Sequence, residues 1–191
     1  EDPIEMVMPA LNQMQVQHSI NSGFVDGIRA WMRQDPDIVM IGEIRDLETA
    51  QIAVQASLTG HLVLATLHTN DAPSAVTRLM DMGIEPFLLA SSLLGVLGQR
   101  LVRLSCQACS GKGCDVCAQS GYVGRAGIYE LMPVTEALRD RIHDRAPESE
   151  LRKQACKDGM RTLAEDCMRW VNSGSTTREE MLRVTGCVQL D

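Results

Sequence analysis

The sequence of 191 residues lacks an excess of basic residues, because 18 Lys and Arg are set against 25 Asp and Glu and the formal net charge is −7. Binding to a nucleic-acid backbone needs clustered Lys and Arg, so this balance argues against a nucleic-acid partner. The N-terminal residues are acidic and include no apolar segment followed by a small-residue cleavage site. We therefore expect no export signal.

A second absence concerns phosphate binding. No G-x-x-x-x-G-K-S/T string occurs in the chain, and this string forms the loop whose backbone amides cradle nucleotide phosphates. The sequence therefore cannot complete an ATP site of this kind by itself. It begins at Glu1 without a methionine, and we expect it to be a fragment of a longer protein.

A long apolar run is also lacking. The densest run, Pro86–Val102, contains Ser91, Ser92 and Gln99 and is followed by Arg103. A transmembrane helix needs about 20 predominantly apolar residues. We therefore expect no membrane span and predict a buried core helix over this range.

A short apolar run leads into a carboxylate. Ile38–Ile41 precede Gly42 and Glu43, and a β-branched run without polar alternation is typical of a strand covered on both faces in a parallel sheet. Ligands of open α/β sheets bind beyond the carboxyl ends of strands, where Glu43 would lie. A carboxylate there can hold the water shell of Mg²⁺ or orient a water against a phosphate. The alternative is a core strand with an incidental charge.

The segments around this strand alternate between helix and strand. The pattern predicts parallel β-α-β units with right-handed crossovers, and hence an α/β fold. The expected elements are a helix over 24–32, a helix over 47–58 capped by Asp46 and closing at Gly60, a strand over 61–67, and a helix from 71–73 to about Gly83.

Other polar residues accompany Glu43 as candidates. His68 falls at the carboxyl end of the second expected strand, although a hydrogen-bonded structural histidine is the alternative. Arg29 and Arg33 are four residues apart and share a helix face, with a solvated basic surface as the alternative. The spacing of His61 and His68 does not match the i, i+4 helical pair of zinc proteases, which argues against a metallohydrolase.

Four of the seven cysteines are clustered. Two C-x-x-C pairs offer four thiolates, and a tetrahedral Cys₄ set is typical of structural zinc. Four unmetallated thiols are the alternative, and only four residues separate the pairs, which predicts a strained loop. An odd number of cysteines with this clustering favours metal binding in a reducing compartment over disulfides. The candidate ligands are Cys106, Cys109, Cys114 and Cys117.

The rest of the chain is read as an extended segment and short helices. Residues 121–133 contain several glycines and predict extended structure. Helices are expected from Thr135, from Pro147 to Gly159, and after two capping boxes, Thr162-x-x-Glu165 and Thr177-x-x-Glu180. We predict a small C-terminal helical appendage whose charges form a solvated face.

Long strings in the sequence resemble a known family. Residues 33–46 (RQDPDIVMIGEIRD) and 59–71 (TGHLVLATLHTND) resemble the Walker-B and His-box regions of the ATPases that drive type II secretion and type IV pilus extension. Residues 81–103 (DMGIEPFLLASSLLGVLGQRLVR) resemble the type II secretion branch more than the pilus branch. The resemblance extends from residue 1 to about residue 186, nearly the whole chain.

The resemblance implies a RecA-like parallel sheet flanked by helices, with ATP hydrolysis as the reaction and Mg²⁺ and Zn²⁺ as cofactors. It implies a homo-hexameric ring in the cytoplasm, bound peripherally at the inner membrane to the secretion platform proteins. It also implies roles for single residues. Glu43 and Glu1 are expected to be catalytic, and His68 is expected to sense the γ-phosphate. Arg29, Arg33 and Arg45 are expected to bind nucleotide, and for Arg29 and Arg33 that nucleotide is held mainly by a neighbouring subunit.

The expected organisation has three parts: a RecA-like core without its phosphate loop (1–104), a tetracysteine zinc module with a return strand (105–132), and a helical subdomain (133–191). The function we expect is that of a motor subunit powering type II protein secretion. A type IV pilus extension ATPase is the alternative within the same class, and a non-enzymatic zinc-bearing interaction module is the alternative outside it.

Overall fold

The computed structural model describes residues 3–16, 24–34 and 36–186. The first half of the fold contains α1 (Phe24–Trp31), the 3₁₀ turn η2 (Met32–Gln34), β1 (Ile38–Ile41), α2 (Leu47–Leu58), β2 (Leu62–Ala65), α3 (Ala72–Asp81) and α4 (Pro86–Ser92). The second half contains β3 (Gly95–Ser105), the 3₁₀ turn η3 (Asp115–Cys117), β4 (Tyr122–Pro133), α5 (Glu136–His143), α6 (Glu148–Lys157), α7 (Leu163–Asn172) and α8 (Arg178–Thr185).

The predicted parallel pairing of the first two strands is confirmed. β1 pairs in parallel with β2, with Ile38 opposite Leu62. Side-chain caps start the helices that follow these strands: Asp46 accepts a hydrogen bond from the backbone N–H of Thr49, and Asp71 forms a capping box with Ser74. Because the pairing is parallel and Ile41 lies opposite Ala65, both strands end at the same edge of the sheet.

One face of the β1–β2 sheet is uncovered. Val39 and Ile41 are buried, whereas Ile38 and Met40 are 60% and 54% exposed. The expectation that Ile38–Ile41 is covered on both faces is therefore wrong within the part of the chain that the structure describes. Successive side chains of a strand point to opposite faces, and α1 and α2 cover only one of the two.

The second sheet is a long antiparallel hairpin. β3 pairs with β4 from Gly95 opposite Pro133 to Ser105 opposite Tyr122. The predicted helix over Pro86–Val102 is wrong beyond Ser92, where α4 gives way to an extended backbone. Glycine lowers helix propensity by about 1 kcal/mol, so Gly95 and Gly98 weaken a helix here. The strand itself is held by its pairing with β4, which lies far along the chain.

The helices after β4 pack on two hydrophobic clusters, and the predicted C-terminal appendage stays a prediction. Buried residues of α5 and α6, such as Leu138 and Leu151, join the cluster that contains β1 and α2. Buried residues of α7 and α8, such as Cys167 and Met181, pack on Val102 and Ile128 of the hairpin. All four predicted tail helices are nevertheless present, and they begin at or close to the predicted caps.

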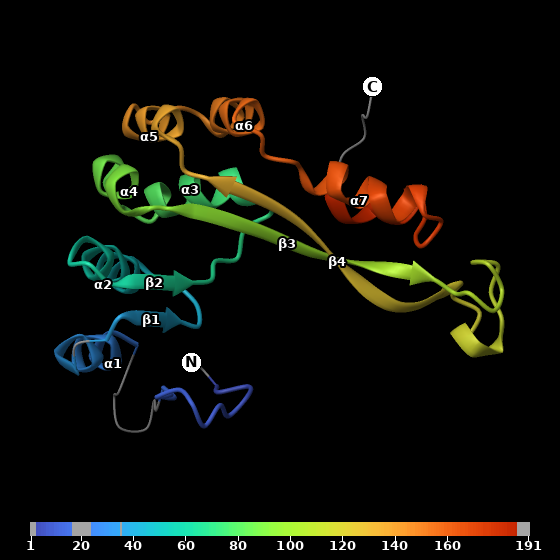
Figure 1. Ribbon diagram of the computed structural model, residues 1–191, viewed down its shortest axis with the longest axis horizontal. Helices are drawn as coiled ribbons and strands as arrows, with labels where there is room; N and C mark the ends of the chain where they lie inside the picture. The colour runs from blue at the N-terminus through green and yellow to red at the C-terminus, as the bar shows by residue number, and fades with distance from the viewer. Residues whose placement is uncertain (1–2, 17–23, 35, 187–191) are drawn as a thin grey trace.

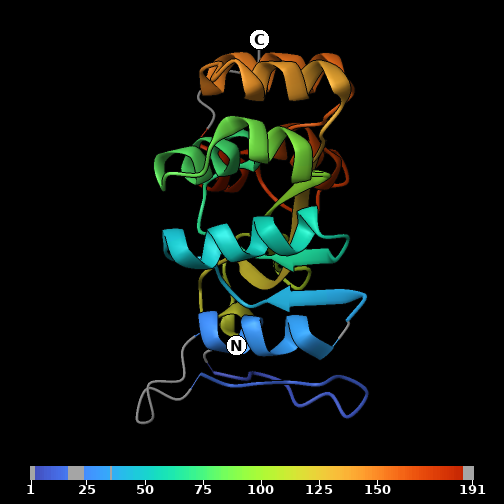
Figure 2. The ribbon, with the colours of Figure 1, turned by 90° about the vertical axis from the view of Figure 1, so that its left-hand side faces the viewer.

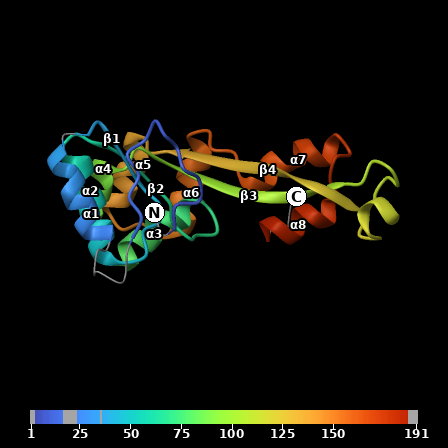
Figure 3. The same ribbon diagram turned by 90° about the horizontal axis from the view of Figure 1, so that it is seen from below.

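The two clusters give the molecule an elongated shape. Figure 1 shows β1, β2 and α1–α6 gathered at one end, while the hairpin extends past α7 to the cysteine-containing turn at the other end. The gathered elements form a stack from α1 and β1 to α5 and α6 (Figure 2). Helices α7 and α8 lie along the middle of the hairpin (Figure 3). Within the described ranges, no helix combines the length and apolar character of a membrane crossing.

Candidate functional site

Three of the predicted site residues meet at the carboxyl ends of β1 and β2. Glu43 follows β1, and its side chain is 17% exposed. One carboxylate oxygen lies 2.8 Å from Nε2 of His68, which follows β2, and the other accepts a hydrogen bond of 2.7 Å from Nε of Arg45. A backbone bond from the N–H of Ile44 to the carbonyl of Thr66 holds the two strand ends together. The sequence placed these groups at strand ends, and the structure brings them into contact.

The other predicted nucleotide-binding residues lie apart from this group. Arg29 of α1 is exposed and lies 3.4 Å from Glu48 in the first turn of α2. Arg33 lies in η2, before β1 begins, and its side chain is exposed. Their predicted roles concern a neighbouring subunit and stay predictions. Glu1 is outside the described residues.

The loop that carries His68 is held by the β3–β4 hairpin. Nη2 of Arg100, on β3, lies within hydrogen-bond distance of three oxygens of Thr69 and Asn70. Glu130, on β4, is buried and accepts hydrogen bonds from the backbone N–H of Ala72 and of Leu163. These N–H groups belong to the first residues of α3 and α7, which have no hydrogen-bond acceptor within their own helices. One carboxylate therefore accepts a hydrogen bond from the N-terminus of each helix. Arg100 was not predicted because its segment was expected to be a helix, and Glu130 was not predicted because its partners Ala72 and Leu163 are 58 and 33 residues away.

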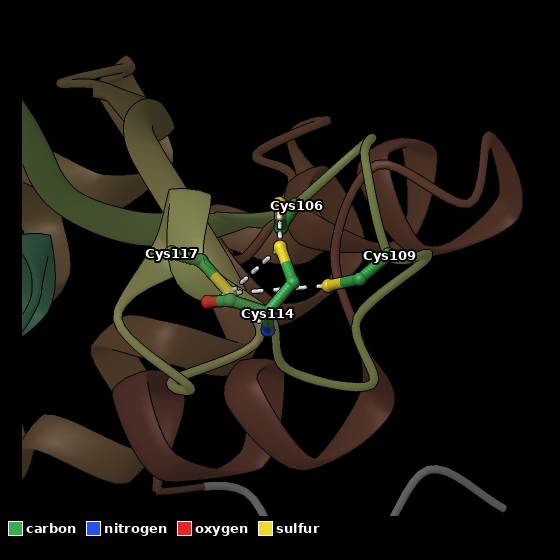
Figure 4. Close-up of side chains that lie close together, drawn as sticks. All are labelled: Cys106, Cys109, Cys114 and Cys117. Carbon is green, nitrogen blue, oxygen red and sulfur yellow. Dashed lines mark hydrogen bonds between the residues drawn. The ribbon is translucent and has the colours of Figure 1, made fainter.

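The four predicted metal ligands form a single cluster at the tip of the hairpin. Their sulfur atoms all lie within 4.8 Å of one another. The Cys106–Cys114, Cys109–Cys117 and Cys114–Cys117 sulfur pairs are 3.9, 3.8 and 3.8 Å apart (Figure 4). A tetrahedral zinc with Zn–S bonds of about 2.3 Å places its sulfurs about 3.8 Å apart. The donor set and spacing therefore fit zinc.

The four-residue linker between the pairs turns by means of left-handed backbone. Ser110, Gly111 and Gly113 have φ of 50°, 81° and 97°, values that glycine adopts without a steric penalty. Gly121 is also required, because a Cβ there would lie 2.4 Å from the carbonyl oxygen of Gly111. The linker that looked too short in the sequence thus closes the cluster mainly through its glycines.

Backbone donors favour charge on one of these sulfurs. Burial raises the pKa of the Cys117 thiol, but hydrogen bonds from the N–H groups of Cys114 and Gly121 outweigh burial and lower it to about 6. Burial raises the pKa of the Cys106 thiol to about 11. Since a metal ligand must be a thiolate, these backbone donors favour the form of Cys117 that binds metal.

A buried carboxylate locks α8 onto the hairpin just before the cysteines. The side chain of Glu180 is 0% exposed and lies 2.7 Å from Nη2 of Arg103 and 2.6 Å from Nη2 of Arg183. Hydrogen bonds from Arg183, and then from Arg103, hold the pKa of Glu180 well below its ordinary value. The prediction of a solvated face is wrong here. Thr177 caps α8 as expected, but the Glu180 carboxylate binds the two arginines.

Comparison with known proteins shows the family. The profile described as "Type II/IV secretion system protein" matches residues 1–183, and the chain therefore belongs to this family. "Type II secretion system protein HxcR" of Pseudomonas aeruginosa is 60% identical over 193 residues, which cover 97% of this chain and 41% of that protein. "Type IV pilus assembly ATPase TfpB" of Acinetobacter baylyi is 48% identical over 211 residues, covering 96% and 36%. The chain thus spans less than half the length of these curated relatives.

A solved structure supports the fold. The crystal structure of "the Pilus Retraction Motor PilT and Bound ADP" is similar with a TM-score of 0.79 and 30% identity. The match covers 98% of this chain and 52% of that one. The chain is thus an α/β fold with a parallel sheet and helices, similar to that of this pilus retraction motor.

Proposed function

We propose that this chain is part of an ATP-hydrolysing motor subunit that powers type II protein secretion through pseudopilus assembly. The observation that carries the proposal is the contact between Glu43 and His68 at the carboxyl ends of two neighbouring parallel strands. Ligands of open α/β sheets bind at this edge. Family membership and the similarity to HxcR support the choice of secretion as the work performed.

Glu43 is the residue to which we assign the chemistry. Both of its carboxylate oxygens are already held, one by His68 and one by Arg45, so its orientation is fixed before a nucleotide binds. In this proposal Glu43 polarises the attacking water or holds the water shell of Mg²⁺, which when bound neutralises charge on the phosphates. His68 then senses the γ-phosphate through its ring, and Arg45 steadies the carboxylate and contacts the nucleotide.

The arginines of α1 and η2 are proposed to act on a site held mainly by a neighbouring subunit. Arg29 and Arg33 are exposed on the outside of the stack, where a neighbouring chain can reach them. A planar guanidinium suits phosphate oxygens and the charge that develops during transfer. We assign Glu1 a second acidic role near the γ-phosphate, and we infer a homo-hexamer as the assembly.

The uncovered face of the first sheet supports the proposal that the rest of the longer protein completes the site. Ile38, Met40, Leu62 and Leu64 are all at least 41% exposed, and burying apolar surface stabilises a fold by about 25 cal/mol per Å². We propose that a segment bearing the phosphate loop covers these side chains and makes residues 1–104 part of a complete RecA-like core.

We assign a structural zinc to the cysteine cluster in residues 105–132 and treat residues 133–191 as the helical subdomain. A closed Cys₄ set leaves no open position for a substrate, so zinc would stabilise the hairpin tip. In the secretion machinery the motor is proposed to work in the cytoplasm, docked peripherally on platform proteins of the inner membrane.

The type IV pilus extension ATPase remains the alternative within the class, favoured by the 48% identity to TfpB. The two alternatives can be distinguished by identifying which platform protein, from the secretion or the pilus machinery, is captured by the full-length protein. The non-enzymatic zinc module is the remaining alternative. The full-length sequence tests it, because a G-x-x-x-x-G-K-S/T string outside these residues supports the motor and its absence supports the module.

The central experiment is Glu43→Gln in the full-length protein. The substitution keeps the shape and removes the charge, so we expect nucleotide binding to persist while turnover falls by about 10²-fold or more. Glu85→Gln is the matched control, because Glu85 is an exposed partner of Arg145 elsewhere on the surface. Near-normal turnover in Glu43→Gln would contradict the assignment.

A further inference from the structure

The positive charge of Arg100 sits among three oxygens of the loop that follows His68. Its Nη2 lies 3.0 Å from Oδ1 of Asn70, 3.2 Å from the carbonyl oxygen of Asn70 and 3.3 Å from that of Thr69. The two hydrogens of this nitrogen are shared among three acceptors. A charged donor strengthens each contact relative to a neutral one, so Arg100 fixes the carbonyls of the two residues next to His68.

His68 depends on this backbone because little else restrains it. Its side chain is 87% exposed, so packing does not hold the ring, although Nε2 lies 2.8 Å from Glu43. Upstream, the loop is tied to β1 through Thr66, whose carbonyl accepts from Ile44. Arg100 supplies the corresponding restraint downstream of His68.

The hairpin holds the end of the same loop with a second group. Glu130 lies opposite Gly98 in the β3–β4 register and accepts a hydrogen bond of 2.6 Å from the N–H of Ala72. A Cβ at Gly98 would lie 2.9 Å from Cγ of Glu130 and 3.4 Å from the nitrogen of Ala72. Glycine therefore allows the close approach, and the segment from Thr69 to Ala72 is held by a cation at one end and a carboxylate at the other.

We infer that Arg100 is a positioning residue for ATP hydrolysis, acting through the backbone of Thr69 and Asn70 to hold His68 against Glu43. The inference rests on the proposed function of the Glu43–His68 site. Arg100 itself contacts neither Glu43 nor His68 within the part of the chain that the structure describes. A misplacement of about 1 Å at a reacting centre can cost about 10²-fold in rate, so a loosened loop lowers turnover more than nucleotide binding.

The contact geometry specifies the test variants. A single nitrogen of Arg100 makes all three contacts, and the ammonium of lysine also offers three donors on one nitrogen. Arg100→Lys should therefore restore part of the restraint. Arg100→Met keeps most of the apolar stem and removes every donor. Arg141→Met is the matched control, since it removes an exposed arginine whose partner, Glu150, lies 3.4 Å away on the far helices.

The experiment uses the full-length protein and combines steady-state ATP hydrolysis, binding of a non-hydrolysable ATP analogue, thermal melting, and hydrogen exchange of the amides in residues 67–71. Arg100→Met is expected to lower kcat by about tenfold or more and to change analogue affinity by less than about threefold. Exchange over 67–71 should accelerate. Arg100→Lys should recover most of the lost kcat and protection, and Arg141→Met should match the parent protein.

Other results would overturn either the inference about Arg100 or the proposed ATPase function. Unchanged kcat in Arg100→Met, with or without faster exchange, shows that the restraint is not needed for turnover. Equal losses in Arg100→Lys and Arg100→Met, together with lower melting temperatures, show a purely structural residue. A parent protein that does not hydrolyse ATP overturns the proposed function instead, and the exchange comparison then shows by itself whether Arg100 holds the loop.

Discussion

Glu180→Gln is the perturbation whose effect can be worked out most fully from the structure. The carboxylate accepts hydrogen bonds from the backbone N–H and side chain of Arg103, at 3.0 Å, 3.1 Å and 2.7 Å, and from two nitrogens of Arg183, at 2.7 Å and 2.6 Å. Glutamine keeps one acceptor oxygen but turns an NH₂ group toward these donors. The substitution therefore removes the negative charge and places the NH₂ group of glutamine next to the N–H donors of Arg103 and Arg183.

The expected cost of Glu180→Gln lies in the lower of two reference ranges. A hydrogen bond to a charged group contributes about 1.5–3 kcal/mol, and breaking a fully buried ion pair costs about 3–5 kcal/mol. The side chains of Arg103 and Arg183 are 43% and 56% exposed, so water can solvate them when the carboxylate is lost. We therefore expect a destabilisation of about 2–3 kcal/mol, confined to α8 and the neighbouring part of the hairpin.

Hydrogen exchange of the full-length protein measures this local free energy. A change of 2–3 kcal/mol corresponds to a loss of protection of about 30- to 150-fold, at about 1.4 kcal/mol per tenfold. Glu179→Gln is the matched control, because Glu179 is exposed in the same first turn of α8. Equal protection in the two variants would refute the reasoning.

The same experiment has a defined pH dependence. The pKa of Glu180 is lowered in the folded protein, and an unfolded glutamate titrates near about 4.3. The stability from the carboxylate is therefore fully present above the unfolded pKa and is lost as pH falls toward the folded value. The difference between Glu180→Gln and the parent protein should be constant from neutral pH to about pH 5 and shrink below it.

Three further predictions concern the other sites. Freshly purified, reduced full-length protein should contain one zinc per chain, and Cys114→Ser should lose it and lower the melting temperature; four freely titratable thiols in the native parent would exclude the site. Mixing an Arg33→Ala protein with a Glu43→Gln protein should restore some ATPase activity through mixed sites, whereas inactivity of every mixture with rings formed would place each site within one chain. Glu130→Gln should cost about 1–3 kcal/mol and weaken exchange protection at the starts of both α3 and α7, and an effect on one helix alone would contradict the double cap.

Local signals explain which parts of the fold could be predicted from the sequence. Asp46 and Asp71 start α2 and α3 through contacts with residues three positions away, so the signal and its partner lie in one short window. The C-x-x-C pairs are equally local, because the turns that close the cluster lie within residues 106–121. Glu43 and His68 were found because strand ends in parallel β-α-β units share an edge.

Long-range partners explain what could not be predicted. The run after Ser92 is apolar enough for a buried helix, and its identity as a strand depends on β4, which begins at Tyr122. Glu130 looks like a surface charge until Ala72 and Leu163, 58 and 33 residues away, are placed beside it. Alternation along 95–105, with Gly98, Arg100 and Val102 on one face, was the signal that could have indicated a strand.

The wrong prediction that Ile38–Ile41 is buried on both faces has a different cause from the wrong prediction of a helix over 86–102. The run reads as a strand buried on both sides, whereas the structure buries only Val39 and Ile41 and leaves Ile38 and Met40 at the surface. The neighbouring strand repeats the pattern, since Leu62 and Leu64 are exposed as well. Two adjacent parallel strands that both present apolar side chains on one face are atypical of a finished sheet, because parallel sheets are covered on both faces. The hydrophobicity of Ile38–Ile41 is thus explained by our proposal that a segment outside the described residues covers this face, and that segment is where we place the phosphate loop.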